Sequence, residues 1–335
     1  MMTLPIKTDA IIVGAGLAGL MAGRVLANAG KHVVLVDKGR SVGGRMATRR
    51  LGGGLADHGA QFFTARDPEF GALVSQWVAE GLVFEWSRGW SDGSLAAATS
   101  DGHPRYATYK GMNALTMHLA TKLDVRTGVK LVAVQQVEGG WQVEDESGRK
   151  QSAKALLLTP PVPQSLDLLD DGNVKLSSHD RAALEALEYD PCLTGMFVLD
   201  RPIQLPAPGA IQRSYANLYW IADNQRKGIS PDAVIVTAQA GAIYSRELAD
   251  LSDDKILAAF RVDLLPWLGE AKIVEAQLKR WRYAQPVSIY PERCLVVPRG
   301  NTPLVFAGDA FGGPRVEGAV LSGLVAGRAL LAQLA

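Results

Sequence analysis

The first forty residues alternate between short apolar runs and glycine-rich turns. Residues 10–13 form an uninterrupted apolar run, which is typical of a strand buried on both faces of a parallel sheet. Apolar residues then recur at helical spacing over residues 17–25, and Gly30 lies where a C-terminal helix cap belongs. A second apolar run, residues 32–36, ends at Asp37. The pattern therefore predicts a β-α-β unit at the start of the chain.

Helices and strands are also predicted farther along the chain. They are a helix over residues 67–80, a helix after Gly111, short strands over 129–134, 141–144 and 155–158, a buried strand over 304–307 and an apolar helix over 318–334. The middle, residues 160–291, has a less regular pattern and holds most of the large aromatic residues. Because strand–turn–helix units stand at both ends, we expect the ends to share one domain and the middle to form another.

Composition and charge disfavour several classes of function. With 35 Lys and Arg against 34 Asp and Glu, the formal charge of +1 offers no field for nucleic acid or an anionic membrane. Cys192 and Cys294 are too few for a disulfide framework, and the five histidines lack the spacing of a helical zinc site, so no metal is expected. Residues 1–7 do not resemble a leader, and no long apolar window occurs. We therefore expect a cytoplasmic protein.

The turn after the first strand has the spacing G-x-G-x-x-G. Gly14 would make the tight turn, Gly16 would let the backbone approach a pyrophosphate, and Gly19 would let the helix pack closely on the strand. Asp37 would accept hydrogen bonds from an adenosine ribose, and the pyrophosphate would lie on the helix N-terminus. The alternative is a turn that merely needs glycines. The expected dinucleotide contacts are Gly14, Ala15, Gly16, Leu17, Ala18, Asp37 and Lys38.

A second pair of glycines follows the second strand. Residues 43–48, Gly-Gly-Arg-Met-Ala-Thr, resemble the flavin-containing amine oxidase superfamily, in which this segment contacts the diphosphate and ribityl chain of FAD. Residues without side chains admit the cofactor, and a planar guanidinium pairs with its phosphates. The alternative is an ordinary solvated loop. The resemblance implies FAD contacts by Gly44, Arg45 and Met46.

A third segment of the same superfamily pattern closes the chain. Residues 306–309 end the last strand with Gly308 and Asp309, and residues 315–323 open the last helix. The resemblance implies that Asp309 binds the ribityl or pyrophosphate region and that the helix N-terminus, with Gly318 and Ala319, lies at flavin N1 and O2. Asp309 could instead be a helix cap. Residues 310–318 contain no Cys or His, so we expect FAD to be bound non-covalently.

Four further segments narrow the resemblance to bacterial renalases. They are residues 57–67, 217–224, 280–284 and 315–319, and the likeness extends over essentially the whole chain. The resemblance implies an α/β fold, with a Rossmann-like FAD-binding domain and an inserted substrate domain built on a mixed sheet. We expect the FAD-binding domain over residues 1–66, 106–160 and 290–335, and the substrate-binding domain over residues 67–105 and 161–289.

The resemblance also implies an activity, which is the FAD-dependent oxidation of 2- and 6-dihydro isomers of NAD(P) to NAD(P)+, with O2 reduced to H2O2. Amine oxidases of the superfamily place a lysine beside flavin N5, but the comparable residues 189–198 contain none, and only Phe311 is available for an amine cage. A dihydropyridine needs no base, because hydride loss alone makes it aromatic. The alternatives are an amine oxidase, a non-catalytic FAD-binding redox sensor and an NADPH-dependent hydroxylase.

The contacts of the flavin ring and the substrate are also predicted. Gly59, Ala60, Gln61 and Phe62 would meet the flavin, while strand alternation turns Phe63 inward, and Val129 would give adenine a backbone contact. Each aromatic candidate for the pocket could equally be core. His58 is expected to be structural, and Arg213, Arg226 and Lys227 are candidate phosphate partners. The substrate candidates are Phe62, Trp220, Asn224, Trp281 and Tyr283, with Asn224 as the partner of a carboxamide.

Overall fold

The computed structural model describes residues 7–94 and 100–334, so most of the stretch in which no leader is expected, residues 1–6, lies outside the described residues. The chain forms two compact units, each built from separate segments. Unit 1 comprises residues 1–44, 116–188 and 286–335, and unit 2 comprises residues 45–115 and 189–285. Compared with the expected domain ranges, residues 45–66 and 106–115 lie in unit 2, and residues 161–188 and 286–289 lie in unit 1.

Unit 1 is built on an eight-stranded sheet. Its strands are β1 (Thr8–Val13), β2 (Val33–Val36), β7 (Asp124–Arg126), β8 (Leu131–Val137), β9 (Gly140–Asp145), β10 (Lys150–Leu158), β16 (Leu295–Val297) and β17 (Leu304–Phe306). Strands β7, β2, β1, β10 and β17 are parallel neighbours in this order, while β16 and the β8–β9 hairpin pair antiparallel. The predicted β-α-β unit is confirmed, with β1 and β2 almost fully buried as parallel strands require.

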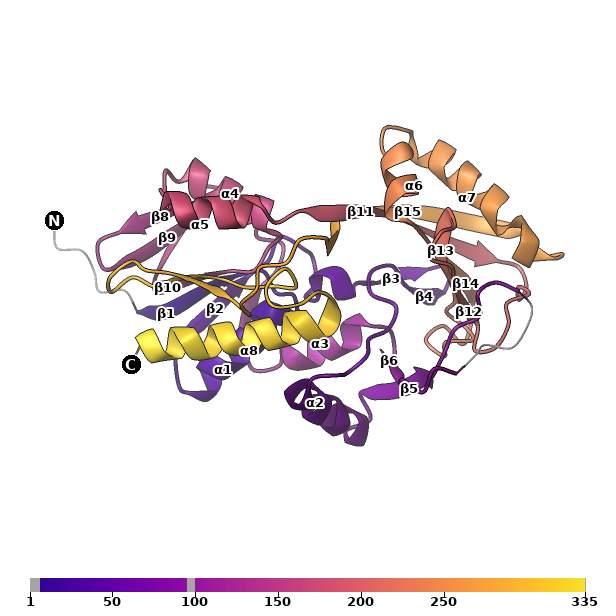
Figure 1. The fold of residues 1–335 in the computed structure, drawn as a ribbon, viewed down its shortest axis with the longest axis horizontal. Helices are drawn as coiled ribbons and strands as arrows, with labels where there is room; N and C mark the ends of the chain where they lie inside the picture. The colour runs from indigo at the N-terminus through magenta and orange to yellow at the C-terminus, as the bar shows by residue number, and fades with distance from the viewer. Residues whose placement is uncertain (1–6, 95–99, 335) are drawn as a thin grey trace. The chain divides into compact units, whose positions relative to one another are not determined.

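The helices of unit 1 are α1 (Leu17–Asn28), α4 (Val162–Asp171), α5 (Ser178–Glu185) and α8 (Arg315–Gln333). Helices α1 and α8 run side by side (Figure 1), although they come from opposite ends of the chain. A Cβ atom on Gly323 of α8 would lie 2.3 Å from the carbonyl oxygen of Ala18 in α1. The two backbones therefore touch at this point, which only glycine permits. Helix α8 begins at Arg315, as the prediction that residues 315–323 open the last helix requires, and three residues before the apolar helix predicted over 318–334.

Unit 2 is built on a five-stranded sheet in the order β12-β13-β14-β11-β15. These strands are β11 (Tyr189–Leu199), β12 (Ala210–Gln212), β13 (Leu218–Asp223), β14 (Val234–Ala240) and β15 (Ile273–Pro286). The sequence pattern of the middle, which is less regular, does not reveal this sheet. Strand β14 is buried at every residue and therefore shows no alternation, whereas the edge strand β15 is rich in charged residues, so neither has the period-two pattern that reveals a strand.

The two faces of the five-stranded sheet meet different partners. On one face Phe197 and Val236 pack against α7 (Asp253–Leu268) through Phe260 and Trp267. On the other, Met196 and its neighbours pack against the β3–β4 hairpin. The remaining elements of unit 2 are β3 (Thr48–Leu51), β4 (Gly54–Asp57), α2 (Pro68–Ala79), β5 (Val83–Ser87), β6 (Arg105–Thr108) and α6 (Ala242–Glu247). Two short helices, η1 (Gly44–Met46) and α3 (Asn113–Leu119), include residues of both units.

Helix α2 confirms the helix predicted over residues 67–80. The Asp67 carboxylate accepts hydrogen bonds from the backbone N–H of Glu69 and Phe70, and Pro68 follows in the first turn. Within residues 7–94 and 100–334, none of the helices has the length and apolarity needed to cross a bilayer.

Candidate functional site

In unit 1 the glycine turn between β1 and α1 has the form that a dinucleotide requires. Gly14 has a φ of +98°, which favours glycine, and a Cβ on Gly19 would lie 2.0 Å from the Gly14 carbonyl oxygen. A Cβ on Gly16 would meet nothing within 4 Å. Gly16 is also the N-cap of α1. No side chain accepts a hydrogen bond from the N–H groups at this helix end, and the first turn contains no acidic residue. The open space and the uncapped helix end fit a bound diphosphate.

Asp37 lies at the carboxyl end of β2, against the same turn. Its two carboxylate oxygens accept hydrogen bonds from the N–H of Ala15 at 2.7 Å and of Gly39 at 2.6 Å. Its carbonyl oxygen accepts the N–H of Val129 at 3.0 Å. The predicted ribose and adenine contacts, Asp37 and Val129, are therefore neighbours in unit 1. Lys38 points elsewhere, since its Nζ donates to Gln164 Oε1 at 3.0 Å.

The last strand and helix of unit 1 form a second glycine turn. The N–H of Gly308 donates to Ser322 Oγ at 2.8 Å, and Asp309 is buried beside it. Helix α8 has Pro314 as its N-cap and no side-chain cap. Gly318, predicted near the helix start, lies within the first turns, where a Cβ would lie 1.7 Å from the Gly313 carbonyl oxygen. Its role in the fold is thus close packing of its own turn.

In unit 2 the segment 57–61 is held by side chains from the five-stranded sheet and its loops. The Asp57 carbonyl accepts from Thr237 Oγ1 at 2.9 Å, and the Gly59 carbonyl accepts from Gln239 Nε2 at 2.8 Å. The His58 carbonyl accepts from Trp281 Nε1 at 2.7 Å. A Cβ on Gly59 would lie 2.0 Å from the Arg45 carbonyl oxygen. The segment predicted to meet the flavin ring is therefore held in place by side chains of β14 and β15.

Arg45 lies on the other side of that close approach. The Ala60 N–H donates to the Arg45 carbonyl at 2.8 Å, and the Arg45 guanidinium donates to the Ala284 carbonyl at 3.2 Å. The loop that follows the paired glycines and the segment 57–61 are thus joined backbone to backbone in unit 2. Both carry residues predicted to contact FAD.

Lys227 is not a phosphate partner, because it is fully buried. Its Nζ lies 2.6 Å from Asp57 Oδ2 and 2.6 Å from the Gln61 carbonyl oxygen. Burial lowers the pKa of Lys227, while the Asp57 carboxylate acts to raise it. The other two candidate phosphate partners also have protein contacts: the Arg226 guanidinium donates to the Leu205 carbonyl, and the Arg213 guanidinium lies 4.6 Å from the Trp267 ring centroid.

Asn224, the predicted partner of a carboxamide, has its amide occupied by the protein. Its Oδ1 accepts from the Asp57 N–H at 3.2 Å, and its Nδ2 donates to the Ile235 carbonyl and Thr237 Oγ1, both at 2.9 Å. The side chain is fully buried. Asn224 therefore joins β4 to β14 and has no free group for a substrate, which corrects the sequence-based prediction.

Phe62 and Phe63 point in different directions, as alternation predicts. Phe63 is buried against Phe70 and Tyr106. Phe62 is half-buried and packs on Trp90 and Trp220, with ring centroids 5.0 and 5.3 Å away. With Trp86 and Tyr219 these residues form one aromatic cluster, and the indole N–H groups of Trp86, Trp90 and Trp220 have no hydrogen-bond partner in the described chain. Trp220 is only 1% exposed, so it supports Phe62 from behind.

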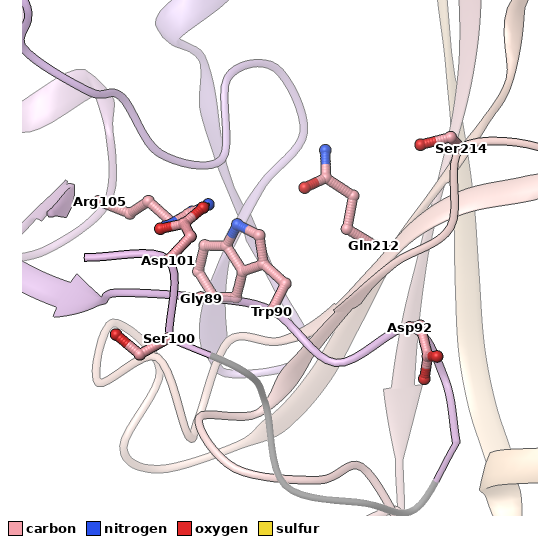
Figure 2. Close-up of a pocket in the computed structure, with 8 residues that line it drawn as sticks. All are labelled: Gly89, Trp90, Asp92, Ser100, Asp101, Arg105, Gln212 and Ser214. Carbon is pink, nitrogen blue, oxygen red and sulfur yellow. The ribbon is translucent and has the colours of Figure 1, made fainter. Parts of the chain in front are cut away.

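A polar hollow of about 350 Å³ opens beside this cluster in unit 2. Figure 2 shows Arg105 and Asp101 together next to the Trp90 ring, with Gln212 at the end of β12 and Ser214 in the turn that follows. Arg105 makes a two-point ion pair with Asp101, with N–O distances of 2.8 and 2.5 Å. The sequence did not single out this hollow.

His58 is structural, as expected. Its ring stacks on Trp281 with centroids 5.5 Å apart, and it is only 5% exposed. Burial, with the charges of Arg49 and Lys279, lowers the pKa of His58 to about 3, so the imidazole is neutral at pH 7. Tyr283 lies farther along β15, where it packs edge-on against Tyr189 at 5.7 Å.

Three residues that hold segment 57–61 were missed or misassigned from the sequence: Thr237, Gln239 and Lys227. A signal was present for the first two, because polar residues two apart in the otherwise apolar run of β14 lie on the same face of a strand. Lys227 stands in a turn with no periodic neighbours. Its ion pair joins positions 170 residues apart, which no local pattern records.

Comparison with known proteins gives a consistent set of similarities. The sequence profile of a family described as flavin-containing amine oxidoreductase matches residues 79–331, and that of an NAD(P)-binding Rossmann-like domain matches residues 12–77. Renalase from Mus musculus is 23% identical over 331 residues, which cover 94% of this chain and 96% of that protein.

Solved structures show the same fold. A putative protoporphyrinogen oxidase from Exiguobacterium sp. 255-15 superimposes with a TM-score of 0.73 at 15% identity, over 96% of this chain and 98% of that chain. Putrescine oxidase bound to putrescine superimposes with a TM-score of 0.72 at 17% identity, over 98% of this chain and 99% of that chain.

Proposed function

The chain belongs to the flavin-containing amine oxidoreductase family and is a flavin-dependent oxidoreductase, and from this premise we propose that its substrates are the 2- and 6-dihydro isomers of NAD(P). The product is NAD(P)+, O2 is the electron acceptor, and FAD is bound without a covalent link. Bound FAD would supply the two-electron acceptor for hydride from the dihydropyridine.

The similarity to renalase supports this assignment because of its extent. It covers almost the full length of both proteins, whereas the match to putrescine oxidase from Kocuria rosea covers 71 residues, or 21% of this chain. A match confined to one short segment reports at most a shared local feature, but a match over 94% of the chain includes the segments that shape a substrate pocket.

The observation that carries the proposal is the chemistry of the side chains around segment 57–62. His58 has its pKa lowered to about 3, which makes it a poor base, and Lys227 is paired with Asp57. Residues 189–198, on β11, include no lysine. A dihydropyridine becomes aromatic by losing hydride and needs no group to remove a proton. The described residues here suit such a donor better than an amine.

The chain's own residues would then bind the cofactor and orient it. In unit 1, Gly16 and the N-terminus of α1 would hold the diphosphate, with Asp37 at the ribose. In unit 2, residues 59–62 would meet the flavin ring, and Phe62, backed by Trp90 and Trp220, offers a planar apolar face. Trp281 and Tyr283 remain proposed parts of the pocket.

Anaerobic mixing of the flavin-loaded protein with 2- or 6-dihydro-NAD(P) tests the proposal. We expect rapid bleaching of the flavin absorbance and recovery of one NAD(P)+ per flavin reduced. Bleaching by an amine, with aldehyde as product and no reaction with either isomer, would overturn it in favour of an amine oxidase. Full flavin occupancy without reduction by any donor would favour a redox sensor, and steady reduction by ordinary NADPH would favour a hydroxylase.

Non-covalent attachment has its own test. Acid precipitation of the loaded protein should release all of the yellow flavin into the supernatant as FAD. Flavin that remains with the precipitated chain would contradict this part of the proposal.

A further inference from the structure

Lys227 makes three contacts that together use the whole ammonium group. Its Nζ lies 2.6 Å from Asp57 Oδ2, 2.6 Å from the Gln61 carbonyl oxygen and 4.9 Å from the centroid of the Trp86 ring. An ammonium has three N–H donors, and an aromatic face attracts a cation. The side chains of Lys227 and Asp57 are both 0% exposed. The pair is therefore sealed inside unit 2.

Stability alone does not account for a lysine at this position. Removing two charges from water costs several kcal/mol per ion, and apolar residues of similar volume often replace a buried pair without loss of stability. A methionine would fill the same space but could not donate a hydrogen bond. What lysine adds is a directed bond to one carbonyl oxygen, that of Gln61.

That bond fixes the plane of the next peptide group. In a trans peptide the carbonyl of one residue and the N–H of the next point in opposite directions. Because Lys227 holds the Gln61 carbonyl, the Phe62 N–H points away from the ion pair. In the described chain this N–H has no acceptor, whereas the next one, of Phe63, donates to the Tyr106 carbonyl at 2.9 Å.

A second peptide of the segment is oriented in the same way. Trp281 Nε1 holds the His58 carbonyl at 2.7 Å, so the Gly59 N–H points away from Trp281, and it too has no acceptor among the described residues. Side chains of unit 2 thus hold two carbonyls of the segment, and the N–H group that follows each carbonyl points away from the side chain that holds it. Free donors held in place are what a bound acceptor needs.

We propose that Lys227 is a positioning residue of this enzyme, which turns the Phe62 N–H toward a carbonyl or ring-nitrogen acceptor of the bound flavin. The inference rests on the proposed function only in that residues 59–62 meet the flavin. It does not depend on which substrate reduces it. A donor at that place stabilises the negative charge that collects on the ring when it is reduced.

Amide hydrogen exchange tests the proposal without any substitution. In the flavin-free protein the Phe62 amide should exchange quickly, and FAD binding should slow it at least tenfold, by about the protection of one hydrogen bond. The Phe63 amide should be slow in both states. A Phe62 amide that exchanges at the same rate with and without FAD would overturn the proposal.

A double variant tests the role of Lys227 itself. Asp57→Asn combined with Lys227→Met removes both charges together, so that no unpaired charge stays buried. We expect it to bind FAD with a shifted visible spectrum and a more negative midpoint potential, because the Phe62 N–H is no longer held. The matched control, Asp9→Asn with Lys154→Met, removes a pair of the same chemistry from unit 1 and should change neither property.

Lys227→Arg separates positioning from charge. It keeps the positive charge beside Asp57 but changes the donor geometry at Gln61, so it should shift the flavin spectrum while leaving the protein folded. An unaltered spectrum and potential in both Lys227 variants would reduce Lys227 to a structural residue. These readouts use no substrate, so a failure of the dihydro-NAD(P) assay would leave them intact.

Discussion

Trp281 donates a 2.7 Å hydrogen bond from its indole nitrogen to the His58 carbonyl, and the two rings stack with centroids 5.5 Å apart. This contact joins β15 to the segment predicted to meet the flavin. It also buries the imidazole, whose Nδ1 has no hydrogen-bond partner in the described chain. A buried imidazole without a partner is stable only when neutral, which has a measurable consequence.

The stability of the protein should fall as the pH drops below 6.5. The pKa of His58 is lowered from 6.5 to about 3, so between these values the unfolded chain binds one proton more than the folded protein. Stability from this group is complete above pH 6.5 and declines by about 1.4 kcal/mol per pH unit as the pH falls toward 3. His58→Phe keeps the ring stack and removes the titration. At pH 5, urea unfolding should show the variant relatively more stable than at pH 7, by about 2 kcal/mol.

The control for this experiment is His179→Phe, because His179 is exposed on α5. It should leave the difference between pH 7 and pH 5 as it is in the unsubstituted protein. Equal pH dependence in the His58 variant and the unsubstituted protein would mean that His58 is protonated in the fold, contrary to the argument from burial.

Two alanine substitutions in the first glycine turn should affect different properties, one the affinity for FAD and the other the stability of the fold. A Cβ on Gly16 meets open space and its φ of −78° suits any residue, so Gly16→Ala should change the unfolding free energy of the flavin-free protein by less than about 0.5 kcal/mol. It would intrude on a bound diphosphate and should weaken FAD binding tenfold or more. Gly19→Ala would press on the Gly14 carbonyl at 2.0 Å and should destabilise the flavin-free protein by about 2 kcal/mol or more.

Titration with FAD and urea unfolding of the flavin-free protein separate the two cases. If Gly16→Ala unfolds the flavin-free protein as strongly as Gly19→Ala, Gly16 is a packing residue. If FAD binding is unchanged, the diphosphate does not pass over this turn.

Local sequence patterns predicted a residue's role correctly where its contacts are with residues close to it in the sequence. The roles of Gly14 and Gly19, and the capping of α2 by Asp67, follow from bonds that close within a few residues. Patterns failed where the partner is remote. Asn224 and Lys227 were assigned to ligands, but their partners lie on β4 and in segment 57–61, which the fold brings close from far along the chain.

The same difference explains the sheet of unit 2. A strand shows its period only when one face is wet, and β14 is buried on both faces while β15 is polar along much of its length. Composition could not distinguish these strands from irregular segments. The resemblance to a family did predict a sheet for this domain, because it carries information about the whole fold, although the pairings β12–β13, β13–β14 and β11–β14 are antiparallel and the prediction was a mixed sheet.

Asn224→Ala should lower stability more than it affects substrate binding. The substitution leaves the buried Asp57 N–H without its acceptor and removes the Nδ2 bonds to the Ile235 carbonyl and Thr237 Oγ1, which should cost about 2–4 kcal/mol in urea unfolding. The neighbouring Gln225→Ala removes one hydrogen bond, to the Pro231 carbonyl at an exposed site, and should cost under about 1 kcal/mol. A large rise in KM for the dinucleotide without loss of stability in Asn224→Ala would restore Asn224 as a substrate contact.

Gly59→Ala should disable the segment that Lys227 and Trp281 hold in place. A Cβ at this position would lie 2.0 Å from the Arg45 carbonyl oxygen, so the backbone must shift, and the residues predicted to meet the flavin shift with it. We expect a loss of about 1–3 kcal/mol in unfolding free energy and a marked loss of FAD, measured as the ratio of flavin to protein absorbance.

Gly71→Ala is the matched control in the same unit. Its Cβ would meet nothing within 4 Å, and alanine favours the helix interior, so stability should rise by up to about 1 kcal/mol with flavin content unchanged. Equal flavin content in the two variants would show that the close approach of Gly59 to Arg45 does not shape the cofactor site.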